Sequence, residues 1–213
     1  MITVMKVLAF IFAILITGAH GSCNIGSQTD PKGKATPEDP TNYHEFCISS
    51  LRNQVKMEFE AALQYLVMGA YFDQDTINLK GFGKFFWESA DEERQHGLQF
   101  IKYLRHRGDK GLDFFQGDIE PILRKYSWSD GLDALRDALM MEKKVSGSIK
   151  KIIDICSVEG KQDYLSGDWL TGTWLEEQMD GQRKLAGLIN TLSNFRIDHE
   201  ALGDWMFSES LLE

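Results

Sequence analysis

The chain has 213 residues, 43% hydrophobic and 26% charged, an ordinary globular composition that can bury one well-packed core. Acidic residues outnumber basic ones by 32 to 23, and the net charge of −9 argues against nucleic acid or anionic lipid as a partner while favouring cations.

The first residues have the anatomy of a secretory signal peptide. Lys6 precedes an apolar run over residues 7–16, and the triplet Ala19-His20-Gly21 follows it. Because the run is too short to span a bilayer, we expect a signal peptide over residues 1–21, cut after Gly21, and a location in the secretory pathway or outside the cell. No later stretch is long or apolar enough to be a membrane anchor.

Residues 22–42 contain three of the four prolines and are rich in Gly, Ser, Thr and Asp, which predicts an extended arm before a folded domain over residues 43–213. Three cysteines are too few for a disulfide scaffold, although a secretory compartment would oxidise exposed thiols. Cys156 is interpreted as a small buried hydrophobic residue. The pairing of Cys23 and Cys47 stays open. Either could form a bridge, within one chain or between chains, with a cysteine whose Cα lies within about 7 Å.

Two long amphipathic helices are expected first, over residues 43–72 and 78–106. Their inward faces recur by steps of three and four residues. On the first helix this face contains Leu51, Val55, Glu58, Ala62, Tyr65, Gly69 and Phe72. On the second it contains Phe82, Phe86, Glu93, His96 and Phe100.

Residues 107–128 are rich in Gly, include Pro121 and predict a long connection. Further helices are expected over residues 129–158 and 164–195, followed by a short fifth helix over residues 199–211. No strand-like alternation stands out. The prediction is an all-α fold, a four-helix bundle with one long crossover and a short C-terminal helix.

Each long helix has a polar residue in the middle of its apolar face. These residues are Glu58, Glu93 with His96, Glu142 and Gln178, and Tyr65 lies two turns beyond Glu58. No Lys or Arg shares these faces, so a bound cation would have to offset the buried carboxylates. Oxygen ligands with one imidazole suit a pair of iron ions.

The ligands predict two unequal iron positions. Glu93 would bridge both ions, Glu58 and His96 would complete one position, and Glu142 would hold the other. A second Glu-x-x-His is missing, since Glu142 is followed three residues later by Val145. The second position should therefore bind iron weakly, as a substrate rather than as a resident cofactor.

From residue 42 onward the sequence resembles ferritins of the heavy, iron-oxidising type. The motifs "MEFEAALQYL", "NLKGFGKFFWESADEERQHG", "MEKKVSGSI" and "WLEEQMDGQRKL" occur in the order and at the spacing of that family, and the arm and cysteines resemble secreted insect ferritins. The resemblance implies a shell of twenty-four subunits that oxidises Fe(II) with dioxygen and stores ferric mineral.

By position, the resemblance implies that Glu58, Glu93, His96 and Glu142 are the ferroxidase ligands. Gln178 would form an outer hydrogen bond, Tyr65 would be the tyrosine of the site, and Glu92 would lie between the site and the inner surface. These assignments make the chain a ferroxidase, with iron as substrate and cargo.

The sequence departs from the heavy-type pattern at Gln95, Leu98 and Thr171, where acids are usual, although Asp168 is kept. A light-type partner chain could supply the missing acids, so we expect a mixed shell, with an N-terminal cysteine linking or bracing subunits. Two alternatives remain, a catalytically inert cage subunit and a di-iron oxygenase.

Overall fold

The computed structural model describes residues 44–160 and 162–213; the expected signal peptide, the N-terminal arm and Cys23 lie outside this range. The described residues form helices and no strands. The elements are α1 (Glu45–Phe72), α2 (Lys80–His106), α3 (Gly131–Cys156), α4 (Tyr164–Trp169), the π-helical turn η1 (Leu170–Trp174), α5 (Leu175–Phe195) and α6 (Glu200–Ser210). None of these helices is long and apolar enough to cross a membrane. The predicted all-α fold is confirmed.

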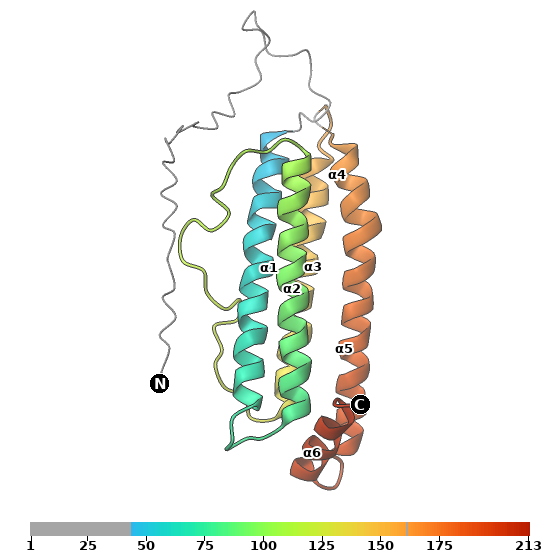
Figure 1. Ribbon diagram of the computed structural model, residues 1–213. Coiled ribbons are helices and arrows are strands. Elements are labelled where there is room, and N and C mark those ends of the chain that lie inside the picture. Colours follow the sequence, from blue (N-terminus) through green and yellow to red (C-terminus); the bar gives the residue numbers. More distant parts are fainter. Residues whose placement is uncertain (1–43, 161) are drawn as a thin grey trace, which may run out of the picture. The chain divides into compact units, whose positions relative to one another are not determined.

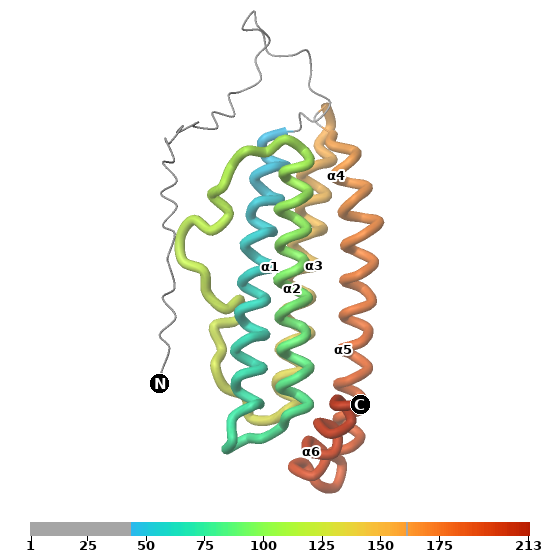
Figure 2. The backbone as a smooth tube through the Cα atoms, in the orientation of Figure 1, coloured from blue at the N-terminus to red at the C-terminus, as the bar shows by residue number. Residues whose placement is uncertain are grey.

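The long helices form a bundle with one crossover. α1 and α2 are antiparallel neighbours, and α4, η1 and α5 continue one another as a single rod (Figure 1). The segment between α2 and α3 runs back along α1, so α2 and α3 point in the same direction (Figure 2). α6 lies at the end of the bundle where α5 ends (Figure 1). The predicted crossover and short C-terminal helix are both present.

Local backbone chemistry sets the helix boundaries within two residues of the expected ones. Asn78 has a φ of 52°, in the left-handed region, so the helix expected from residue 78 begins at Lys80 instead. The carboxylate of Asp130 accepts a hydrogen bond from the backbone N–H of Asp133 (2.7 Å). This N-cap starts α3 at Gly131 rather than at residue 129.

Aromatic packing fills the core between α1 and α2. Phe72, Phe82 and Phe86 are fully buried, and the rings of Phe72 and Phe82 stack with centroids 5.1 Å apart. Burial of each such side chain contributes about 1.5–3 kcal/mol. A Cβ on Gly97 would lie 2.6 Å from the ring of Phe59, so this glycine lets the two helices approach closely.

The crossover is held against α1 by hydrogen bonds from a buried amide. Gln64 Nε2 donates to the backbone oxygen of Lys125 (2.7 Å), and its Oε1 accepts from the backbone N–H of Leu123 (3.1 Å). The N–H of Ile122 donates to the backbone oxygen of Glu60 (3.1 Å). These bonds fix the connection on one side of the bundle and leave the opposite side of α1 for the core.

A disulfide joins Cys47 at the start of α1 to Cys156 at the end of α3, with Cα atoms 5.0 Å apart. The interpretation of Cys156 as an unpaired hydrophobic residue is therefore wrong, and Cys47 is not free to link subunits. Because α3 is antiparallel to α1, residues that are 109 positions apart meet at the same end of the bundle.

Candidate metal centre

Four helices each contribute a buried polar side chain to the middle of the bundle. Glu58 on α1, Glu93 on α2, Glu142 on α3 and Gln178 on α5 are only 1%, 4%, 8% and 3% exposed. Each occupies a position where its helix would otherwise present an apolar residue to the core. The structure thus brings the predicted residues together.

Three of the predicted ligands form a tight group. Ligand atoms of Glu58, Glu93 and His96 all lie within 4.8 Å of one another. Glu93 and His96 are one turn apart on α2, and the Nδ1 of His96 lies 3.5 Å from Oε1 of Glu93, beyond a good hydrogen bond. Gln54 Nε2 donates to Oε1 of Glu58 (2.8 Å) and orients that carboxylate. Two carboxylates and an imidazole suit a first-row transition metal.

Glu142 is held differently, by neutral donors. The hydroxyl of Tyr65 donates to its Oε1 (2.6 Å), and Gln178 Nε2 donates to its Oε2 (3.0 Å). No imidazole accompanies Glu142, so a cation on this side would have fewer strong ligands than one beside His96. The two sides of the centre therefore differ in the side chains that could bind a cation.

Several buried polar atoms in the centre lack a hydrogen-bond partner among the described residues. They are Oε2 of Glu58, Oε2 of Glu93, Nδ1 of His96 and Oε1 of Gln178. Buried polar atoms are normally satisfied, because leaving them unpaired costs about 1–3 kcal/mol each and more for charged groups. All four can donate a lone pair, which is what a bound cation requires.

The surroundings of the carboxylates oppose their negative charge when no cation is bound. Burial raises the pKa of Glu58 well above its usual range, and the nearby charge of Glu93 raises it further. Burial and the charge of Glu142 raise the pKa of Glu93 in the same way. Burial and Glu142 also raise the pKa of the Tyr65 hydroxyl, which therefore stays protonated as a donor. Metal binding at this centre must displace protons.

The mouth of the centre is acidic. Glu92 and Glu177 are exposed and line the same cavity as Glu93 and His96. An Oε1 of Glu177 lies 3.3 Å from Nε2 of His96. Glu177 is not among the predicted site residues, and its one signal in the sequence is its position immediately before Gln178.

A basic residue also lines this cavity, although the inward helix faces carry none. Lys184 lies on the exposed side of α5, and its Nζ is 5.5 Å from the ring centroid of Phe85. The long lysine side chain reaches the cavity from outside the inward face.

The π-helical turn η1 shifts the inward face of the fourth rod just before the centre. Leu175, which follows η1, is partly exposed, whereas Trp174 is 2% exposed and packs edge-on against the ring of His96. A π turn adds a residue to one helical turn and so rotates the helix beyond it. Side-chain periodicity alone does not predict this shift.

Known proteins match this chain over most of its length. The family described as Ferritin-like domain matches residues 48–195. A ferritin heavy chain of Trichoplusia ni is 38% identical over 216 residues, covering 99% of this chain and 97% of that protein. A ferritin heavy chain of Drosophila melanogaster is 41% identical over 180 residues, covering 83% and 88%.

A solved structure agrees with these matches. The crystal structure of Trichoplusia ni secreted ferritin superimposes with a TM-score of 0.79 at 40% sequence identity, covering 89% of this chain and 97% of the other. With the four-helix fold and the buried carboxylate centre, these matches establish that the chain belongs to the ferritin family.

Proposed function

We propose that this chain is an iron-storage subunit whose buried centre oxidises Fe(II) to Fe(III) with dioxygen. The observation that carries the proposal is the tight group of Glu58, Glu93 and His96, whose lone-pair atoms lie within 4.8 Å of one another. Glu58 and Glu93 each have a buried carboxylate oxygen without a hydrogen-bond partner among the described residues, which a cation would satisfy, and carboxylate oxygens with one imidazole suit iron.

Each residue then has a distinct role. Glu58 and His96 bind the first Fe(II), and Glu93 bridges it to a second Fe(II) held by Glu142. Gln178 and Tyr65 orient Glu142 through its two oxygens. Glu92 lies at the exposed mouth, where it assists the transfer of oxidised iron toward the interior of the shell.

Iron is a substrate and cargo here rather than a resident cofactor. The position beside Glu142 lacks an imidazole, and its amide neighbour carries no charge, so an ion there is released readily. An inert cage subunit would have lost these ligands, and a di-iron oxygenase would have a second Glu-x-x-His. Counting iron atoms per chain after aerobic loading separates the three functions, because only a storage subunit takes up more than two iron atoms per chain.

Ferritins assemble into multi-subunit shells. For this chain we propose a shell of twenty-four subunits that includes light-type chains. Gln95 and Thr171 are exposed positions where acids are usual in heavy-type chains, and Leu98 is a partly exposed one. A partner chain with acids there would help to nucleate the mineral.

One relative of known structure is a secreted ferritin. We propose that residues 1–21 form a signal peptide and residues 22–42 an N-terminal arm, which makes this chain a secretory-pathway or secreted protein. N-terminal sequencing of the protein from its source would detect cleavage after Gly21.

The test of the centre replaces its two most specific ligands together, as Glu93→Lys with His96→Gly. Stopped-flow measurement should find that rapid Fe(II) oxidation is lost while the helical circular dichroism and native mass are kept, because both iron positions lose a ligand. Glu88→Lys is the matched control, since Glu88 is exposed on the same helix. Oxidation at the native rate in the double variant would overturn the assignment.

A further inference from the structure

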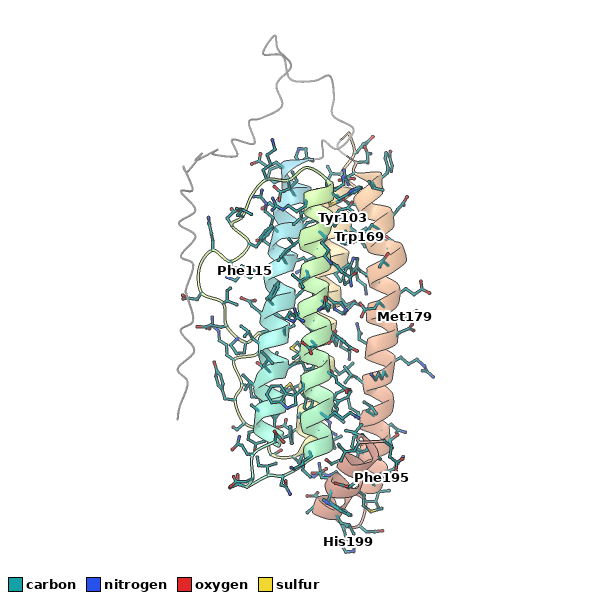
Figure 3. The ribbon with its side chains drawn as sticks, in the orientation of Figure 1. Tyr103, Phe115, Trp169, Met179, Phe195 and His199 are labelled. Atoms are coloured by element: carbon teal, nitrogen blue, oxygen red, sulfur yellow. A yellow bond between two sulfur atoms is a disulfide. The ribbon has the colours of Figure 1, made fainter. Side chains whose placement is uncertain are left out.

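A row of aromatic rings leads from the centre toward the end of the bundle where α2 finishes. The ring of Trp174 lies 5.2 Å from that of His96, and Trp169 lies 5.5 Å from Trp174. Tyr103 stacks on Trp169 with centroids 3.9 Å apart and an interplanar angle of 5°. Figure 3 shows Tyr103 and Trp169 together where α2 and the fourth rod meet. Phe100 packs against both tryptophans and closes the gap between them.

The inner end of this row can give up an electron but not a proton. Trp174 is 2% exposed, and its Nε1 has no hydrogen-bond partner among the described residues. An oxidised indole at this position keeps its proton, because the part of the chain that the structure describes offers Nε1 no acceptor. The missing electron must then come from the next ring.

At the outer end of the row, a chain of hydrogen bonds can carry a proton away from Tyr103. The hydroxyl oxygen of Tyr103 lies 2.8 Å from Oγ of Ser166, and Ser166 Oγ donates to Oδ2 of Asp163 (2.9 Å). Since the single proton of Ser166 goes to Asp163, Tyr103 donates to Ser166. Arg107 Nη1 donates to the Tyr103 oxygen (2.8 Å) and to Oδ1 of Asp163 (3.0 Å), which fixes the geometry. A phenol that loses an electron also loses its proton, and this path receives it.

We propose that Trp174, Trp169 and Tyr103 form an electron relay that serves the iron centre, so that dioxygen is reduced to water instead of leaving as hydrogen peroxide. The inference rests on the proposed ferroxidase function. Electron transfer between rings in van der Waals contact is fast, and each step here joins rings whose contact is established above.

The electrons come from two sources and balance the reduction of dioxygen to water. Dioxygen takes two electrons from the two Fe(II) ions of the centre and two more through the relay, one at a time. With four protons from solvent it becomes two water molecules. Each time one electron passes along the relay, Trp169 reduces Trp174 and Tyr103 reduces Trp169. The phenol proton of Tyr103 then moves through Ser166 to Asp163.

Between passes, an Fe(II) ion arriving outside the centre returns an electron to Tyr103. Asp163 then returns the proton through Ser166. Tyr103 is half-buried at the edge of the bundle, so a diffusing ion approaches it more closely than it approaches Trp174. The ion that resets the relay becomes Fe(III), so each dioxygen consumes four Fe(II) in all. Without the relay each dioxygen consumes two Fe(II) ions, and the product released is hydrogen peroxide.

The test compares assembled native protein with Tyr103→Phe and Trp169→Phe, loaded with a few Fe(II) per chain so that mineral chemistry does not contribute. Fe(II) oxidised is measured by absorbance, dioxygen by electrode and hydrogen peroxide by a peroxidase assay. Trp128→Phe is the control, because Trp128 packs on Tyr71 and Phe72. The native protein and the control should oxidise about twice as much Fe(II) per dioxygen as the two relay variants, which should release hydrogen peroxide.

Rapid freeze-quench electron paramagnetic resonance gives a second readout. In a Tyr65→Phe background, which removes the tyrosine of the centre, a tyrosyl radical should form and should vanish with Tyr103→Phe. Equal stoichiometry and equal radical signals in native and relay variants would overturn the relay. If the native protein oxidises no Fe(II), the proposed function itself fails, so the two failures are distinguishable.

Discussion

The disulfide between Cys47 and Cys156 gives a stability prediction whose size follows from the fold. It closes a loop spanning 109 positions, and both cysteines are fully buried. The chain-entropy model assigns a cross-link of this length a stabilisation of about 5 kcal/mol. Since a domain of this kind has a total stability of about 5–15 kcal/mol, the bond is a large part of it.

The variants are Cys47→Ala, Cys156→Ala and the double substitution. Each breaks the same bond, so we expect each to lower the free energy of unfolding by about 5 kcal/mol, and the double variant to lose little more than either single one. Independent residues would instead give additive losses. The expected fall in melting temperature is about 10–20 °C for a chain of this size.

Calorimetry and guanidinium titration followed by circular dichroism measure the loss. All proteins should be assembled and at one concentration, because assembly adds stability by mass action. Native protein reduced during unfolding should match the variants, since it too lacks the cross-link. Additive single losses, or a total below about 1 kcal/mol, would refute the reasoning from loop entropy.

Three further outcomes are expected. The raised pKa values of Glu58 and Glu93 mean that the iron-free folded state binds more protons than the unfolded chain. The thermal stability of the iron-free protein should therefore fall as pH rises above 4.5. In scanning calorimetry, Glu58→Gln should reduce this dependence of stability on pH. Gly81→Ala would place a Cβ 1.7 Å from a backbone oxygen of α6, so limited proteolysis should release α6, whereas the control Gly187→Ala, with nothing within 4 Å, should leave it protected. Gln178→Glu adds a negative ligand at the weaker position, and the variant should turn over iron more slowly and retain more of it after chelation; equal retention would remove our explanation for iron release.

Residue spacing alone predicts the helices and the side chains that they bury. Helical periodicity is a local property, so the buried faces of α1 and α2 follow from residue spacing alone. The same spacing marks Glu58 and Glu93 as polar interruptions of those faces, and Glu142 and Gln178 are their counterparts on α3 and α5. All four are buried in the structure. The Gly and Pro residues of the crossover likewise indicated a connection before any contact was known.

Which side chains meet across helices depends on how the helices pack. The partner of Cys47 depends on two helices ending at the same place, and the contact of Glu177 with His96 depends on how α5 is rotated about its axis. The π turn η1 sets that rotation and brings Trp174 against His96. These contacts join residues that are far apart in sequence. They depend on the register and rotation of one helix relative to another, and the spacing of residues within a single helix does not specify either of these.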